Sequence, residues 1–369
     1  MTFIKNLFLI FKVLIITFFF TLIIDFFFGQ KILNQFDSFF LKSQFGEKLV
    51  RIDHPVYHHT LRENIVYSSN VSFIGTYELC TNNFGFKSKC NQVDKKDYQF
   101  AFIGDSFTEG TPIEYDDTFV GLFSEKTGYK TANLGIASYS PKIYLSKLNF
   151  LINEGFKFNH VIIFIDISDF YDDTNFYSIN EELIVSQKNS RKKSLKRKKF
   201  LRKNFPLTNF YMYVLRKYKI KENKLIQIPK DTMPIFNEKT NLKAKWTYSK
   251  TDKLEGYEIG ISEGNKNMTE QMIKLYDILK KNNIDMSLAI YPWPHQLNND
   301  VEDSIHVKIW EDFCKKRCEN FINYFPIFFD KMNKSSYLET YNKYYFQNDP
   351  HFNKEGHKVL ANKFVEIFK

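Results

Sequence analysis

The sequence predicts an α/β protein, a three-layer α/β/α domain built on a short parallel sheet. From residue 98 onward, apolar runs of four to seven residues alternate with helical segments, which is typical of buried parallel strands joined by crossover helices. Aromatic residues make up 18% of the chain, enough apolar mass for a large core. We expect five strands, at Tyr98–Ile103, Tyr129–Leu134, His160–Ile165, Asp285–Ile290 and Phe321–Pro326.

Three parts are predicted along the chain: an anchor at residues 1–28, a small lobe of strands and loops at 29–97, and the α/β domain at 98–369. Short alternating runs such as Asn64–Asn70 favour strands in the lobe. A long stretch, about 172–258, separates the third and fourth strands and has little strict periodicity. We interpret it as an inserted helical or irregular subdomain at the border of the site.

The apolar segment Leu7–Phe28 is 22 residues long, about the length that a helix needs to cross a bilayer. Lys12 and Asp25 flank its charge-free stretch and can lie at the two interfaces. A cleaved signal peptide is the alternative, but no small-residue cleavage pattern follows. Positive charges precede the segment, so we expect a single-pass anchor in the bacterial cytoplasmic membrane, with the rest of the chain facing the periplasm or exterior.

The net charge of +10 belongs to one segment, because residues 188–203 hold ten Lys or Arg and no acidic residue. The rest of the chain is therefore nearly neutral, which argues against a nucleic-acid partner. Such a run is most often a solvated, flexible face. Contact with an anionic lipid surface or an acidic polysaccharide is the alternative.

The four cysteines fall into two close pairs, and an exported domain permits disulfides. Cys80 and Cys90 flank a turn with a glycine and are candidates for a bridge. Cys314 and Cys318 lie four positions apart on a predicted helix, where free buried thiols are at least as well favoured. Neither pair has the partners of a zinc site. The histidines within 51–60 lack metal-ligand spacing, so we predict no metal.

A serine follows the first core strand directly, in the run Gly104–Gly110. Ligands bind beyond the carboxyl ends of parallel strands, and a helix N-terminus there stabilises developing negative charge. Gly104 permits a tight turn, and Asp105 can cap the backbone after it. An ordinary strand-to-helix turn favours the same residue types, so the position of Ser106 alone does not decide.

The run Asn348–His357 near the end of the chain supplies a base for this serine. Asp349 and His351 share one loop, so the carboxylate can hold one ring nitrogen while the other faces Ser106. Asn353 is placed to cap the last helix, whereas His357 lies within that helix and is expected to be structural. A surface turn with an incidental histidine is the alternative.

Together these runs resemble the SGNH/GDSL hydrolase family, whose first block is a GDS serine motif and whose last block carries the Asp and the His. Asn133–Ser140 is similar to the second block, whose glycine gives a backbone N–H to the oxyanion hole, a role the resemblance assigns to Gly135. Asp166–Asp169 takes the place of the third block, but Ser168 stands where the family has an oxyanion-donating Asn. Losing one such donor costs about 2.7 to 4 kcal/mol of transition-state stabilisation.

Asp349 lies two residues before His351, where many members have three, and this shorter form resembles an exported, membrane-anchored branch of cell-envelope polysaccharide acetyltransferases and esterases. The resemblance covers residue 98 to the C-terminus without the insertion. It implies that Ser106 attacks an ester carbonyl, that His351 is the base and that Asp349 orients it, with no cofactor. The Ser106 and Gly135 amides, with Ser168, would then form the oxyanion hole.

Four further residues are expected to contact the substrate: Asp105, Asp169, Trp293 and His295. The last two follow the fourth strand at the same sheet edge, where a tryptophan can stack on a sugar, although rigid loop packing explains them equally well.

The expected substrate is an acylated carbohydrate of the cell envelope, either hydrolysed or used to acylate a glycan hydroxyl. The alternative is a catalytically inactive, membrane-tethered glycan-binding or assembly protein. The missing Asn at position 168 favours that alternative, and the retention of Ser106, Asp349 and His351 opposes it.

Overall fold

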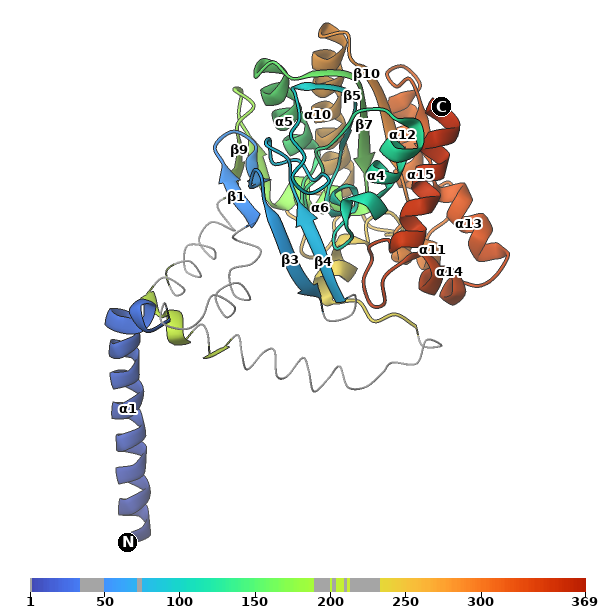
Figure 1. Cartoon of the computed structure of the whole chain (residues 1–369). Helices are drawn as coiled ribbons and strands as arrows, with labels where there is room; N and C mark the ends of the chain where they lie inside the picture. Colours follow the sequence, from blue (N-terminus) through green and yellow to red (C-terminus); the bar gives the residue numbers. More distant parts are fainter. Residues whose placement is uncertain are drawn as a thin grey trace. The chain divides into compact units, whose positions relative to one another are not determined.

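The structure is a computed structural model that describes residues 2–33, 50–71, 75–188, 200, 204–208, 211–212 and 233–369. The chain divides into two compact units. One comprises Met1–Leu49 with Asn189–Pro229, and the other comprises Val50–Lys188 with Lys230–Lys369. The second unit holds the sheet and the predicted site (Figure 1).

A five-stranded parallel sheet forms the centre of the second unit, in the order β11-β10-β7-β5-β6. Its strands are β5 (Asp97–Ile103), β6 (Thr131–Asn133), β7 (Lys157–Ile165), β10 (Asp285–Ile290) and β11 (Phe321–Asn323). All five overlap the predicted strands. Six consecutive residues of β7 are buried, because both faces of the sheet are covered.

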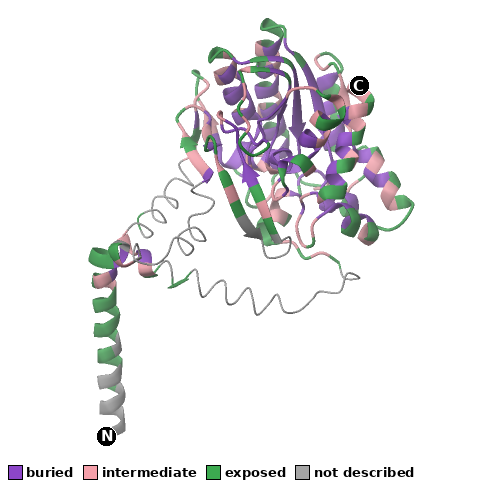
Figure 2. Cartoon of the chain, viewed as in Figure 1, coloured by how far each residue is buried: buried purple, intermediate pink, exposed green. Residues whose placement is uncertain are grey.

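Helices cover the two faces and complete the predicted three layers (Figure 1). On one face α5 (Pro141–Asn153) packs against α10 (Ile261–Lys281), and on the other α4 (Phe119–Thr127) packs against α15 (Lys354–Phe368). Buried residues concentrate in the sheet and on the helix sides that face it (Figure 2). The predicted fold class is confirmed.

Shorter helices and hairpins connect these layers. The helices are α3 (Ser106–Glu109), η1 (Tyr115–Asp117), α6 (Ile167–Asn175), α9 (Glu238–Lys243), α11 (Pro294–Asn299), α12 (Ile305–Cys314), α13 (Phe325–Asn333) and α14 (Tyr337–Tyr344). Three antiparallel pairs are formed by β1 (Arg51–His54) with β2 (His58–Leu61), β3 (Val66–Val71) with β4 (Gly75–Cys80), and β8 (Tyr177–Ile179) with β9 (Val185–Gln187).

The predicted lobe at 29–97 does not form a unit of its own. Its described residues from Val50 onward belong to the same compact unit as the sheet, and Tyr57, Leu61 and Leu79 are part of the same hydrophobic core. Residue 98 is therefore not a domain boundary, because the hairpins bury their apolar side chains against the α/β domain. Residues 34–49 lie outside the described part of the chain.

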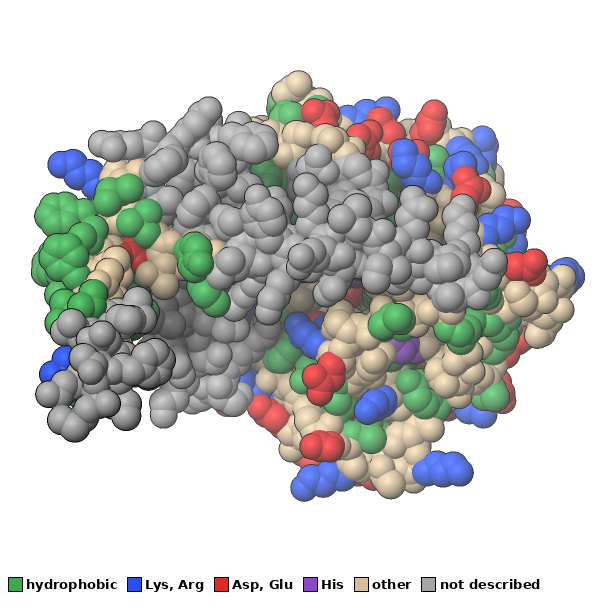
Figure 3. All heavy atoms as spheres, turned by 90° about the horizontal axis from the view of Figure 1, so that it is seen from below, with side chains coloured by type: hydrophobic (Ala, Val, Ile, Leu, Met, Phe, Trp, Pro, Cys, Tyr) green, Lys and Arg blue, Asp and Glu red, His purple; other side chains and the backbone are tan. Residues whose placement is uncertain are grey.

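The insertion contributes β8, β9 and α9 to the second unit. Most of the basic segment 188–203 lies outside the described residues, so its contact with lipid or polysaccharide stays a prediction. On the face seen in Figure 3, the described Lys and Arg side chains are interspersed with Asp and Glu, in keeping with a nearly neutral remainder.

Both cysteine pairs are bonded. The bridge between Cys80 and Cys90 confirms the prediction. Cys314 and Cys318 are also joined, in place of the free thiols that the sequence favoured at least equally. The physical reason is that α12 ends at Cys314, so Cys318 lies in the turn after the helix and not on a shared helical face.

In the first unit, α1 (Thr2–Leu33) contains the apolar span Phe11–Gly29. Its large side chains are mostly exposed (Figure 2), and its length and composition are those of a membrane span or a signal sequence. Asp25 is buried at 2% exposure and accepts the backbone N–H groups of Leu207 and Thr208 at 2.8 and 2.7 Å. The one acidic residue of the apolar span thus has hydrogen-bond partners.

Candidate active site

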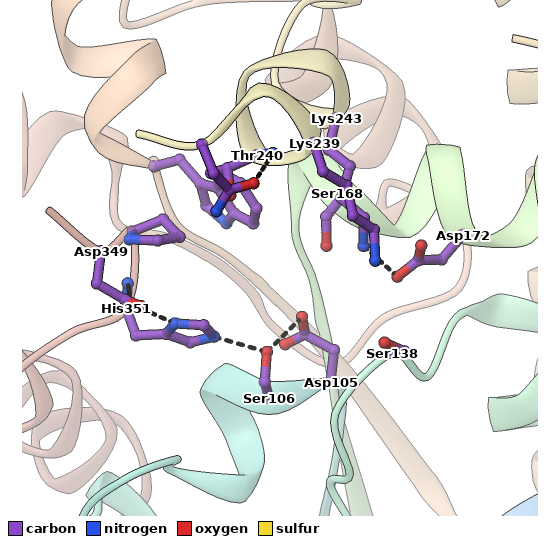
Figure 4. A pocket seen from close by; sticks show the side chains of 13 residues that line it. Asp105, Ser106, Ser138, Ser168, Asp172, Lys239, Thr240, Lys243, Asp349 and His351 are labelled. Carbon is purple, nitrogen blue, oxygen red and sulfur yellow. Dashed lines mark hydrogen bonds and ion pairs between the residues drawn. The ribbon is translucent and has the colours of Figure 1, made fainter. Parts of the chain in front are cut away.

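Ser106, His351 and Asp349 form a continuous hydrogen-bonded chain (Figure 4). Ser106 Oγ lies 2.8 Å from His351 Nε2, and His351 Nδ1 lies 2.5 Å from Asp349 Oδ1. Asp349 Oδ1 also accepts the backbone N–H of His351 at 2.9 Å. The two-residue spacing thus lets the carboxylate bind both the backbone and the ring of His351, which fixes the orientation of the imidazole. Three residues predicted from two distant runs are brought together.

The turn after β5 places the serine. Asp105 caps α3 by accepting the N–H of Phe107 at 2.9 Å, and its other oxygen lies 3.2 Å from Ser106 Oγ. Gly104 is required by close packing, since a Cβ there would lie 2.2 Å from Thr108 Oγ1. Ser106 is therefore the first residue of a helix at the carboxyl end of a central strand, as predicted.

The histidine loop is held by tyrosines and by the last helix. The Tyr341 hydroxyl donates to the carbonyl of Phe346 at 2.5 Å and accepts the N–H of Asp349 at 3.2 Å. Asn353 caps α15, which confirms its predicted place. His357 is buried, and its Nδ1 accepts the N–H of Phe119 at 3.1 Å, which confirms a structural role.

The charges of the pair favour proton acceptance by the imidazole. Burial lowers the pKa of His351, but Asp349, together with the charges of Asp105 and Asp166, raises it more, so the net shift is upward. Burial raises the pKa of Asp349, but His351 lowers it more, so the net shift is downward. Asp349 therefore stays ionised while His351 gains and loses a proton.

The structure places Ser138, and not Gly135, beside the nucleophile. The Gly135 N–H donates to Asn133 Oδ1 at 3.1 Å in a buried position, and Gly135 does not line the pocket. Its lack of a side chain serves packing, because a Cβ would lie 2.6 Å from Thr108 Cβ. The oxyanion role assigned to Gly135 is therefore corrected, since its N–H is already used.

Ser138 lines the pocket and has a φ of 67°, in the left-handed region. Its backbone N–H donates to no acceptor among the described residues, and the same holds for the N–H of Ser106. Sequence reasoning missed Ser138, because a positive φ is expected of glycine and a serine gives no sign of it. Its position three residues after Gly135, in the same run, was the only available signal.

The pocket has a volume of about 290 Å³, and most of the described residues that line it are polar. Trp293 and Pro350 are its only apolar residues among those described. The lining consists of Asp105, Ser106, Ser138, Ser168, Asp172, Asn237, Lys239, Thr240, Lys243, Trp293, Asp349, Pro350 and His351.

The wall opposite the nucleophile comes from the insertion, which confirms that the insertion borders the site (Figure 4). Asn237 caps α9 by accepting the N–H of Thr240 at 3.0 Å. Lys243 Nζ lies 2.6 Å from Asp172 Oδ2 and fastens α9 to α6. Sequence reasoning named none of these lining residues, because the insertion carries no motif or strict periodicity.

Two of the remaining predicted residues line the pocket. Ser168 donates its backbone N–H to Asp166 Oδ1 at 2.7 Å, and its side chain points into the space between α9 and Ser106 (Figure 4). Trp293 is only 4% exposed, with its indole N–H donated to Asp166 Oδ2 at 2.9 Å and its ring stacked near Phe107. Little of the indole face is left to stack on a sugar.

Two other predicted contacts lie away from the pocket and are corrected. His295 stands behind α9, with Nε2 3.0 Å from Asn241 Oδ1, and burial lowers its pKa to about 4. Asp169 is fully buried and accepts the Tyr144 hydroxyl at 2.8 Å. Both side chains are used inside the protein, so neither is free to reach a ligand.

Asp105, Asp166 and Asp169 form a buried group whose carboxylate oxygens lie within 4.8 Å of one another. Burial, followed by the charge of Asp166, raises the pKa of both Asp105 and Asp169 well above the ordinary range. Oxygen ligands of this kind suit a hard cation. Here an N–H or O–H donor of the protein binds at least one oxygen of each of the three residues, and the absence of a metal stays a prediction.

No family model matches this sequence, and no curated protein is similar to it at a significant level. Several solved structures are similar over much of the chain, and three of them are described. A protein described as lipolytic and of the G-D-S-L family, from Desulfitobacterium hafniense, has 14% identity and a TM-score of 0.40, covering 74% of this chain and 100% of its own.

The psychrotrophic esterase EstA from Pseudoalteromonas sp. has 12% identity and a TM-score of 0.37, covering 73% of this chain and 96% of its own. A carbohydrate esterase family 2 enzyme from Corynascus thermopiles, with a carbohydrate binding domain, has 10% identity and a TM-score of 0.37, covering 79% of this chain and 74% of its own. These similarities concern the fold.

Proposed function

We propose that this chain is a serine-dependent enzyme acting on ester bonds, an esterase or O-acyltransferase for an acylated carbohydrate of the cell envelope. The observation that carries the proposal is the chain of hydrogen bonds from Asp349 through His351 to Ser106, at 2.5 and 2.8 Å. A serine, a base and an orienting carboxylate in this order constitute an activated nucleophile.

In the first half of the reaction, Ser106 Oγ attacks the ester carbonyl while His351 Nε2 takes the hydroxyl proton. Asp349 stabilises the imidazolium that forms. His351 then gives the proton to the departing alcohol, which leaves an acyl group on Ser106. In the second half, His351 takes a proton from water or from a sugar hydroxyl, and the oxygen nucleophile that results attacks the acyl-serine. His351 then returns the proton to Ser106 Oγ as the acyl–oxygen bond to Ser106 breaks, which restores the free hydroxyl.

The carbonyl oxygen becomes negative in each tetrahedral intermediate and needs donors. The backbone N–H groups of Ser106 and Ser138, which have no acceptor within the described part of the chain, support an oxyanion hole at the start of α3. The Ser168 hydroxyl, directed into the same pocket, is the third donor. It replaces the amide that the motif usually carries there.

The pocket supports a small acyl group on a polar alcohol. A volume of about 290 Å³ with only two apolar lining residues offers little surface to a long aliphatic chain. Asn237, Thr240 and Lys239 offer instead the hydrogen-bonding groups that sugar hydroxyls need. We therefore favour acetyl or a similarly short acyl group on a carbohydrate, with α1 as a membrane anchor that places the enzyme at the cell envelope.

The test is labelling of the purified full-length chain in detergent with a fluorophosphonate probe, beside the Ser106→Ala variant. Labelling of the wild type that disappears in the variant is the expected result, because only an activated serine reacts with the probe. Equal absence of labelling in both would overturn the enzymatic proposal in favour of a glycan-binding protein. Release of acetate from acetylated glycan, with and without an added acceptor sugar, then separates esterase from transferase.

A further inference from the structure

We propose that Arg51, His59, Glu109 and Tyr177 form a clamp that positions the loop Leu134–Tyr139, so that the Ser138 N–H points at the reacting carbonyl oxygen. The inference rests on the proposed function, because it assigns the oxyanion donor of that same site a means of orientation. The four residues do not line the pocket. They are therefore positioning residues and not catalytic ones.

The loop needs support because of its backbone conformation. Ser138 has a φ of 67°, which residues with a Cβ seldom adopt and which persists only where the surroundings impose it. Glycine would adopt it freely, but serine requires contacts on both sides of the turn.

Glu109 holds the loop from the nucleophile side. This buried residue lies three positions after Ser106, and its Oε2 accepts the N–H of Ala137 at 2.8 Å, while its Oε1 accepts Arg51 Nη2 at 2.6 Å. Burial raises the pKa of Glu109, but Arg51, Lys87 and the Ala137 N–H together lower it more, and the net downward shift keeps the carboxylate ionised. One charge-assisted group thus ties the nucleophile helix, the loop and β1 together.

His59 in β2 fixes the peptide that carries the donor itself. Its Nε2 lies 3.0 Å from the carbonyl oxygen of Ala137, and burial lowers its pKa to about 3, so the ring is neutral and Nε2–H donates. In a trans peptide the C=O and the next N–H point in opposite directions. By holding the Ala137 carbonyl on one side, His59 therefore turns the Ser138 N–H to the other side.

The far side of Ser138 is fixed as well. The Tyr177 hydroxyl donates to the carbonyl of Ser138 at 2.9 Å, and the Tyr139 hydroxyl donates to the carbonyl of His59 at 2.6 Å. The peptide groups before and after Ser138 are thus both anchored, while its own N–H has no partner among the described residues. This arrangement gives the β1–β2 hairpin a function, which the sequence did not reveal.

The decisive variant is His59→Phe in the full-length chain, with hydrolysis of p-nitrophenyl acetate as the assay. The phenyl ring fills the site but cannot donate to Ala137, so we expect kcat to fall about 10- to 100-fold with KM within about twofold, since a misplaced donor acts on the transition state. His59→Gln restores a donor near the Nε2 position and should recover most of kcat.

The matched control is His160→Phe. His160 is also a buried histidine that uses Nε2, 2.8 Å from Ser287 Oγ, and burial lowers its pKa to about 4, but it does not contact the loop. An equal fall of kcat in this control would show a general loss of stability and overturn the proposal. An unchanged kcat in His59→Phe would overturn it too.

Hydrogen–deuterium exchange of residues 134–140 gives a readout that does not depend on activity. We expect faster exchange there in His59→Phe, with β5 and β7 unchanged. If the wild-type chain hydrolyses no ester, the proposed function fails, and the exchange result alone decides whether the clamp exists. Unchanged exchange in the loop would show that it does not.

Discussion

The two walls of the pocket are built in different ways. On the nucleophile wall, Ser106 lies directly after β5 at the start of α3, and His351 lies on the loop before α15. Each is fixed by several hydrogen bonds. The opposite wall is α9, a six-residue helix without a buried residue, which one ion pair between Lys243 and Asp172 fastens to α6. The first wall has the rigidity that chemistry needs, whereas the second is a short helix held by side-chain bonds such as those of Lys243 to Asp172 and of Asn241 to His295, and it can vary with the substrate.

The largest effect should come from the nucleophile wall. Ser106→Ala removes the attacking oxygen, and we expect kcat for p-nitrophenyl acetate to fall by about 10³ to 10⁶. Circular dichroism should show an unchanged fold. Ser178→Ala, at a half-buried position of the β8–β9 hairpin whose hydroxyl bonds only Ser186 among the described residues, is the control and should keep full activity. Residual activity near the wild-type level in Ser106→Ala would place the chemistry elsewhere.

The pH dependence of the activity tests the pair of His351 and Asp349 on the nucleophile wall. The base must be neutral to take a proton, so activity should be lost as the pH falls through the pKa of His351, which Asp349 raises above its ordinary value. Asp349→Asn removes that carboxylate, so the acid limb of kcat should move to lower pH while its plateau drops by about 10² to 10⁴. A limb that stays in place would exclude Asp349 as the partner that sets the pKa.

A change in the α9 wall should affect substrate binding and leave the chemistry intact. Lys243→Met breaks the ion pair to Asp172, and we expect KM for an acetylated glycan to rise about tenfold, while kcat for p-nitrophenyl acetate stays within about twofold. Lys245→Met, two residues further on and exposed, is the matched control. If the small ester were hydrolysed much more slowly, the two walls would not be independent.

The smallest effect is expected from the helix cap. Asn237→Ala removes the side-chain acceptor of the Thr240 N–H and should weaken α9 by about 1 kcal/mol. Because α9 supplies only one wall, KM for the glycan should rise about two- to fivefold, without a measurable change in melting temperature. A clear fall in melting temperature would mean that α9 contributes to the core as well.

The same division explains what could be predicted from the sequence. The five strands are recognisable in the sequence as apolar runs. Ser106 follows the end of one of these strands, and Asp349 and His351 lie just before the last helix, so a parallel sheet places all three at the edge where ligands bind. The helix caps formed by Asp105 and Asn353 could also be predicted from the local sequence, since their hydrogen bonds join residues two or three positions apart.

Features that depend on three-dimensional partners were beyond such reasoning. The oxyanion role was assigned to Gly135 because the second block of the family carries a glycine with that role, but the direction of an N–H follows from its acceptor, here Asn133. His295 and Asp169 lie at the expected sheet edge, yet their side chains are buried. His295 forms a hydrogen bond with Asn241, and Asp169 forms one with Tyr144. The insertion was expected to border the site, but its lining residues could not be named, because nothing in the local sequence of α9 records which of its residues face Ser106.

Ser106 and His351 are 245 positions apart in the chain. During synthesis, the serine is made long before its base, and the loop of His351 takes shape only when α15 can dock against α4. Under the proposed export of the domain, a nascent chain that is still crossing the membrane therefore carries an unactivated serine. Under the proposed function, esters on the inner side of the membrane are spared, and activity begins only after the whole domain has been delivered.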